Sequence, residues 1–261
     1  MTKARLSVLF CAASLALAAC ATEPMVERTT RAAMPEASSL PAMKVFSTPR
    51  PEAPARSNRD IARDFLELSF ELESGRTLPA FSKFEGPIAV RVTGSPPPTL
   101  APDLRRVMAR LRNEAGIDIG RVQPGSPQAG GLITVEAVSR GDIRRFLPKA
   151  ACFVVPNVDS LADYSTKRRT ATASWATMTR RTKIAIFVPA DSSPQELRDC
   201  LHEELAQALG PLNDLYRLPD SVFNDDNMHT VLTGFDMLIL RAYYDDALTS
   251  GMSRAEVAAR L

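Results

Sequence analysis

The sequence predicts an α+β fold, in which helices pack on a small mixed sheet and the C-terminal part is mostly helical. Several short segments carry apolar side chains at every second position, which is typical of strands with one buried face. Longer segments repeat apolar side chains every three or four positions, as amphipathic helices do. Two helix starts of the capping-box type lie late in the chain, at residues 193 and 253. All predicted strands end before the first of them.

The folded part begins near residue 58, where apolar side chains recur at helical spacing and Gly75 is placed to end the helix. A strand follows over residues 87–93, because its apolar side chains alternate with polar ones. Residues 102–115 then show helical periodicity, and Gly116 directly after them is a typical helix terminator.

The second half of the chain is predicted to add four strands and three helices. Ser193 starts a helix with proline at its first position and Glu three residues after the serine, and this helix runs to Gly210. A further helix covers about residues 230–244, and Ser253 starts a short last one. The strands are expected at residues 133–138, 151–155, 183–188 and, around Trp175, 170–179.

Charge and composition exclude several functions. The chain has 261 residues, with 32 Lys and Arg against 30 Asp and Glu, two His and four Cys. Lys3 and Arg5 lie in a segment that we expect to be removed, so the mature chain is balanced, which argues against nucleic acid as a partner. Two histidines cannot form a three-histidine zinc site, and the lack of a CxxC pair excludes zinc ribbons and thioredoxins.

The N-terminus predicts export. Residues 1–19 have the basic start and apolar run of a signal peptide, and the sequence ending in Ala19 and Cys20 resembles the bacterial lipobox. This resemblance implies cleavage before Cys20, lipidation of its sulfur and attachment to a membrane. Residues 20–57 then form a lipidated, Pro-rich tether. Ala21 rather than Asp after the cysteine favours the inner leaflet of the outer membrane, facing the periplasm; the alternative is an ordinary signal peptide.

Cys152 and Cys200 would then lie in an oxidising compartment. Only one intramolecular pairing is open to them, and we expect a disulfide bond. The alternative is two separate buried thiols.

Residues 202–214 contain the strongest motif. His202 and Glu203 could begin an HExxH zinc motif, but Ala206 stands where the second histidine is required. The register one residue later places Glu203 and Gln207 four positions apart, on one face of the helix.

That second register resembles the extended zinc motif of the metzincin metallopeptidases. The resemblance places Glu204 at the position of the general base and Gly210 at the turn. It also places Met252 in a methionine turn beneath the site, and the order of strands and helices resembles the N-terminal half of that fold. The three ligand positions fall on Glu203, Gln207 and Asn213 or Asp214.

Residues 203–252 also resemble a bacterial lipoprotein family known only as domain of unknown function 2927. The resemblance is carried by the motif helix, by the segment from Ser221 to Asp226, by Thr233 and Asp236, and by the stretch from Tyr244 to Met252. That family implies no activity. With the metzincin resemblance, it predicts a single zincin-like domain over residues 58–261.

The substituted ligands make zinc unlikely in such a site, because zinc prefers imidazole and thiolate over carboxylate and amide oxygens. Calcium or magnesium would suit the oxygens better, with Asp225, Asp226 and Asp236 as supporting groups. We expect no cofactor. The alternatives to a functional site are a solvated helix face for the motif, a helix cap and turn for Asp225 and Asp226, and a structural hydrogen bond for Asp236.

A basic run surrounds Trp175 and contains no acidic residue. It either docks an anionic lipid head group, a glycan or an acidic protein, or it is a solvated hairpin whose charges protect an edge strand. Its members are Lys167, Arg168, Arg169, Arg180, Arg181 and Lys183.

Two functions remain open. The first is an anchored envelope lipoprotein whose degenerate metallopeptidase-like cleft binds a peptide, peptidoglycan or an envelope protein without zinc-dependent cleavage. The alternative is an active peptidase or peptidoglycan hydrolase that uses Glu204 as general base with an oxygen-ligated metal.

Overall fold

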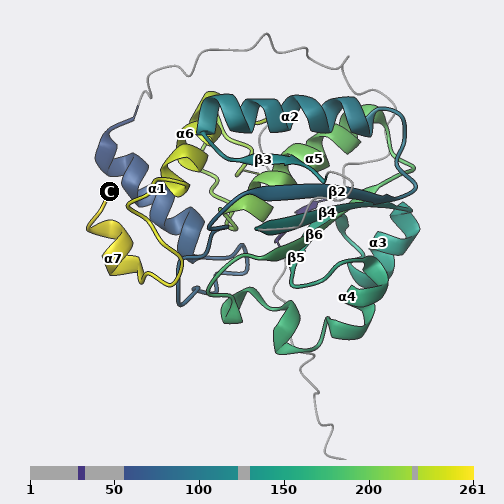
Figure 1. Ribbon diagram of the computed structural model, residues 1–261, viewed down its shortest axis with the longest axis horizontal. Coiled ribbons are helices and arrows are strands. Elements are labelled where there is room, and N and C mark those ends of the chain that lie inside the picture. Colours follow the sequence, from purple (N-terminus) through teal and green to yellow (C-terminus); the bar gives the residue numbers. More distant parts are fainter. Residues whose placement is uncertain (1–28, 33–55, 123–129, 225–228) are drawn as a thin grey trace, which may run out of the picture.

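The computed structural model describes the backbone of residues 29–32 and, in full, residues 56–122, 130–224 and 229–261. Its centre is a mixed sheet in the strand order β1-β5-β6-β4-β2-β3 (Figure 1). β2, β3, β4 and β6 pair in parallel, whereas β5 pairs antiparallel with β6. The strands are β1 (Thr29–Ala32), β2 (Ile88–Gly94), β3 (Ile119–Arg121), β4 (Gly131–Val138), β5 (Ala150–Pro156) and β6 (Lys183–Pro189).

Helices cover both faces of this sheet. Figure 1 shows α2 and α5 on one face and α3 and α4 on the other. It shows α1, α6 and α7 gathered past one end of the strands, on the left of the view. The helices are α1 (Asn58–Phe70), α2 (Leu100–Ala115), α3 (Arg140–Phe146), α4 (Leu161–Lys167), α5 (Pro194–Leu209), α6 (Gly234–Tyr243) and α7 (Arg254–Ala258). None of the described helices is long and apolar enough to cross a bilayer.

The central strands are buried on both faces, as parallel strands between helical layers must be. β5 shows the two sides clearly: Cys152 and Val154 face the larger core with α5, whereas Phe153 and Val155 face a smaller core with α3 and α4. The prediction of a mixed sheet packed by helices, with a helical C-terminal part, is therefore confirmed.

The predicted strand around Trp175 is wrong. Residues Ala171–Ala173 and Trp175–Thr177 form two short 3-10 turns instead. Trp175 is buried in the larger core, and the guanidinium of Arg181 lies 5.0 Å from its ring centre. Tertiary packing and not a ladder of strand hydrogen bonds therefore fixes this segment. The solvated-hairpin interpretation of the basic run is lost with it.

Several predicted boundaries also shift. α1 ends at Phe70, and Gly75 does not end it but closes a turn, donating its N–H to the carbonyl of Leu72 at 2.7 Å. α6 begins only at Gly234, because the side chain of Thr233 caps it. The short elements β3, α3 and α4 were not predicted, because so few residues are not enough to show a period. Gly116 does end α2, in the left-handed conformation expected there.

Candidate functional site

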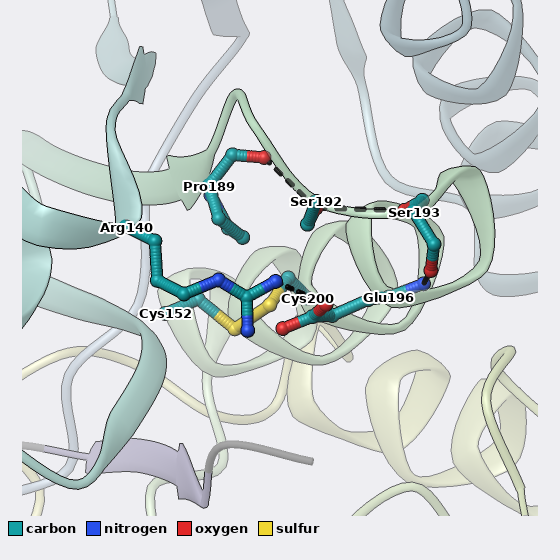
Figure 2. The surroundings of a disulfide bond; sticks show 7 residues. All are labelled: Arg140, Cys152, Pro189, Ser192, Ser193, Glu196 and Cys200. Atoms are coloured by element: carbon teal, nitrogen blue, oxygen red, sulfur yellow. Dashed lines mark hydrogen bonds and ion pairs between the residues drawn. A yellow bond between two sulfur atoms is a disulfide. The ribbon is translucent and has the colours of Figure 1, made fainter. Parts of the chain in front are cut away.

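α5 carries the motif, and its first turn explains why it starts where the sequence predicts. The hydroxyl of Ser193 accepts a hydrogen bond from the N–H of Glu196, and Pro194 follows the cap. The carboxylate of Glu196 does not close the reciprocal half of a capping box. It receives the guanidinium of Arg140 at 2.6 Å, as Figure 2 shows, and so ties α5 to α3.

A disulfide bond holds α5 against the edge of the domain's sheet. Cys152 of β5 and Cys200 of α5 are both fully buried and bonded, with their Cα atoms 5.9 Å apart (Figure 2). The predicted pairing is confirmed, and the alternative of two separate thiols is wrong. Glu203 and Glu204 follow this bond by about one turn of helix and Gln207 by about two, so the bond restrains the motif helix relative to β5.

The polar side chains of the motif are inside the protein. Glu203, Glu204 and Gln207 have exposed fractions of 1%, 0% and 3%, so the interpretation as a solvated helix face is wrong. The side-chain oxygen of Gln207 accepts no hydrogen bond from the described residues. Burying carboxylate and amide groups costs free energy, and a helix can form without burying them. These residues are therefore a constraint on the fold or a site within it.

The C-terminus of α5 is closed by a buried arginine. The guanidinium of Arg181 donates to the carbonyls of Gln207, Ala208 and Gly210 at 2.5, 2.8 and 2.6 Å, and to the carbonyl of Ser82 at 3.0 Å. A cation placed there also complements the negative end of the helix dipole. Burial lowers the pKa of this guanidinium from its usual value. Sequence reasoning missed this role, because the carbonyls that Arg181 contacts lie 26 or more residues away in the sequence.

Gly210 is needed for packing. A β-carbon at this position would lie 2.8 Å from the ring of Tyr243, which is itself fully buried. The glycine was predicted to permit a turn that returns a third ligand. What it visibly permits is the close approach of α6 to the end of α5.

The candidate third ligands lie after that turn, against α1. Leu212 donates its N–H to the carbonyl of Leu68 at 2.9 Å, and the side-chain nitrogen of Asn213 donates to the carbonyl of Glu67 at 3.3 Å. Asn213 thus closes the end of α1. Asp214 beside it is half-buried.

Met252 lies in a turn before α7, as its place in the sequence predicts. Its carbonyl accepts the N–H of Phe81 at 2.8 Å, and its half-buried side chain packs on the large core. Phe81 contacts the ring of Tyr243 at 4.4 Å between centroids, and Tyr243 packs on Gly210. The turn is therefore connected to the end of α5 through two rings that contact each other at a tilt.

Asp236 has a structural hydrogen-bond role. It accepts bonds from the hydroxyl of Ser221 at 2.5 Å and from the N–H groups of Val222 and Thr233 at 3.2 and 2.7 Å, and it completes the capping box of α6. Burial raises the pKa of this carboxyl, and the three donors oppose the rise. Asp225 and Asp226, like Cys20, fall outside the described residues.

His202 lies on the flank of α5 that faces away from the motif. Its side chain is buried, and its Nδ1 accepts the N–H of Leu232 at 3.2 Å. Burial, with Arg110 and Arg198 nearby, lowers its pKa to about 3. The imidazole is therefore neutral and acts as a packing and hydrogen-bonding group, as the failed HExxH register predicts.

A zinc ion does not fit this donor set. Among the residues that the structure describes, no three His, Cys, Asp or Glu side chains are grouped to hold a metal. The motif positions offer carboxylate and amide oxygens without an imidazole or thiolate, the ligands that zinc prefers. The motif of α5 therefore keeps the spacing of a zinc motif without the ligands that zinc prefers.

Comparison with known families shows where the chain belongs. The model of the family described as "Protein of unknown function (DUF2927)" matches residues 58–261, which include every described helix and every strand except β1. No curated protein and no solved structure matches the chain. The chain belongs to the DUF2927 family.

Proposed function

We propose that this DUF2927 member is a lipid-anchored envelope protein whose domain binds an extended peptide along β5, beside α5, without cleaving it. The proposal includes peptides carried by cell-wall material. The order β2, α2, β3, β4, α3, β5, α4, β6, α5 supports a metzincin-like shell, since its strands and its helices α2 and α5 follow the order expected from that resemblance, with the short helices α3 and α4 added.

The observation that carries the proposal is the pairing of β1 with β5. β5 is the edge strand of the family domain, and Thr29–Ala32, which precede that domain, add to it as an antiparallel strand. Thr30 lies opposite Phe153, and after an irregularity Ala32 lies opposite Ala150. Strand addition uses main-chain hydrogen bonds, which any extended peptide can supply. The chain's own segment thus demonstrates an acceptor edge.

The hydrolase alternative has less support. A general base must come within hydrogen-bond reach of its substrate or of a water molecule next to it. Glu204 has an exposed fraction of 0%. Binding of a peptide to the edge of β5 does not require that Glu204 reach the peptide or a water molecule.

Peptide binding to residues 56–261 tests the proposal. All buried apolar residues that the structure describes lie between Phe65 and Val257, so this fragment keeps the whole core while β5 loses its partner. A fluorescent peptide of residues 27–34 should raise its anisotropy saturably on titration. The same peptide with proline at positions 30 and 31 should not, because proline has no main-chain N–H and two adjacent positions remove one N–H from each side of the strand. Equal binding of both peptides, or of neither, refutes strand addition.

The same samples distinguish binding from hydrolysis. Mass spectrometry of the peptide after incubation should show it intact. Cleavage that disappears in Glu204→Gln would replace the binding function by the hydrolase. The anchor is tested separately, since labelled palmitate should enter the full-length protein in cells and fail to enter Cys20→Ala.

A further inference from the structure

The charges of this domain are unevenly distributed along the chain. Residues 140–183 contain ten Lys and Arg against three Asp and no Glu, whereas residues 184–261 contain five Lys and Arg against thirteen Asp and Glu. Residues 58–139 are balanced. A nearly neutral protein therefore carries one strongly basic segment, and this segment includes α3 and α4.

Folding gathers part of that segment around Phe146, at the end of α3. The guanidinium of Arg168 lies 5.7 Å from the centre of the Phe146 ring, and that ring contacts Tyr164 of α4 at 5.4 Å. The basic side chains that neighbour these residues in the sequence form what we call the basic face. They are Arg144, Arg145, Lys149, Arg168 and Arg169, all exposed or half-exposed. Arg145 also pairs with Asp142 of the same helix at 3.2 Å, but its side chain remains 73% exposed.

Other basic residues of the sequence run do not belong to the basic face. Arg181 is buried against the end of α5. Lys183 pairs with Asp159 at 2.9 Å, and Lys167 pairs with Asp163 at 2.9 Å. The basic face is thus a product of how α3 and α4 pack, on the side of the sheet opposite α5 (Figure 1).

The pairing of β1 shortens the distance between this face and the predicted anchor. Ala32 lies opposite Ala150, which directly follows Lys149. Only nine residue steps separate Cys20 from Thr29, so a fully extended chain spans about 30 Å from the lipid to β5. Without β1 the 37 steps from Cys20 to Ser57 would allow about 120 Å.

We propose that the basic face docks on the anionic surface of the phospholipid bilayer that holds the anchor. The proposal rests on the lipid anchor proposed above for the choice of a bilayer over an acidic protein, because the anchor and β1 keep a bilayer within reach at all times. The anchor holds the domain near the bilayer, and a basic face can then orient the domain there, because each basic residue near an anionic surface contributes about 1 kcal/mol, or about fivefold in affinity. Docking on this side leaves α5 turned away from the lipid.

Vesicle sedimentation tests the docking without the anchor. Residues 20–261 carrying Cys20→Ser are mixed with vesicles of phosphatidylcholine alone, or of phosphatidylcholine with phosphatidylglycerol. Binding is expected only with phosphatidylglycerol, and added salt should weaken it. Reversing the charges of Arg145, Lys149 and Arg169 should weaken it at least about a hundredfold, since each basic residue near such a surface contributes about fivefold.

The matched control reverses three exposed arginines elsewhere, Arg59, Arg105 and Arg121. It has the same net charge as the test variant. It should bind the vesicles within about threefold of the parent chain, because salt screens charges that lie far from the contact. Both variants should have the melting temperature of the parent, because the replaced residues are exposed.

Equal weakening by both variants, or no binding to phosphatidylglycerol vesicles, overturns the proposal. Binding to polyglutamate but not to vesicles would assign the face to an acidic protein instead. Because Cys20 carries no lipid here, failure of the anchor in the palmitate experiment is a separate result.

Discussion

Replacing Arg181 with leucine should destabilise the protein by about 3–5 kcal/mol. The change removes the donors to three carbonyls at the end of α5 and to that of Ser82. Each buried acceptor left without a donor costs about 1–3 kcal/mol. The full sum is not expected, because leucine also removes the cost of burying a guanidinium. Lysine at position 181 keeps the charge but cannot reach three carbonyls, so it should lose about half as much.

Urea denaturation followed by circular dichroism measures this loss. The midpoint should fall while the slope stays unchanged, which shows that stability and not compactness has changed. Arg180→Leu is the matched control, since Arg180 is exposed and should stay within about 0.5 kcal/mol. A loss below about 1 kcal/mol in Arg181→Leu, with an unchanged slope, would refute the idea that this guanidinium holds the end of the motif helix.

Three further predictions concern α5 and the residues packed on it. Replacing both Cys152 and Cys200 with serine should cost about 4 kcal/mol by the loop-entropy estimate for a separation of 48 residues, and reductant should then have no effect on the urea midpoint, unlike in the parent. The pKa of His202 is about 3 in the folded protein and 6.5 in the unfolded chain, so the unfolded chain binds the extra proton between these values. The free energy of unfolding should therefore fall as pH drops from about 6.5 towards 3, by up to roughly 5 kcal/mol, and a His202→Gln variant that lost stability just as steeply would contradict this. Gly210→Ala should cost about 1–3 kcal/mol through its clash with Tyr243, and the loss should be non-additive with Tyr243→Leu in a double-mutant cycle.

The sequence predicted the regular elements whose side-chain period is long enough to recognise. The helices ended by Gly116 and started by Ser193 are clear, because caps and apolar spacing agree. Around Trp175 the local pattern failed, since that segment is ordered by a contact with Arg181 and not by a period. Local alternation cannot distinguish a strand from a loop that packs one large ring.

The site was predicted in part. The position of the motif on α5 and the bond from Cys200 to Cys152 followed from spacing and from the small number of cysteines. The burial of Glu204 did not, because a helical wheel gives relative directions and not which neighbours cover each one. The partners of Arg181 lie 26 to 99 residues away, and no local signal points to such contacts.

β5 contacts the motif helix, the helices of the basic face and β1, which are the three parts of the protein that the proposals concern. Its one face is bonded to α5, its other face packs on α3 and α4, and its edge holds β1. A peptide that adds to this edge must displace β1, so binding and tether length are linked. β1 belongs to the same chain as β5, so its effective concentration at the edge exceeds that of a dilute free peptide. The peptide of residues 27–34 should therefore bind residues 20–261 more weakly than residues 56–261, and proline at positions 30 and 31 of the longer chain should remove the difference. Equal affinities for the two parent chains would mean that β1 does not compete for the edge, and the coupling between ligand and anchor would have to be abandoned.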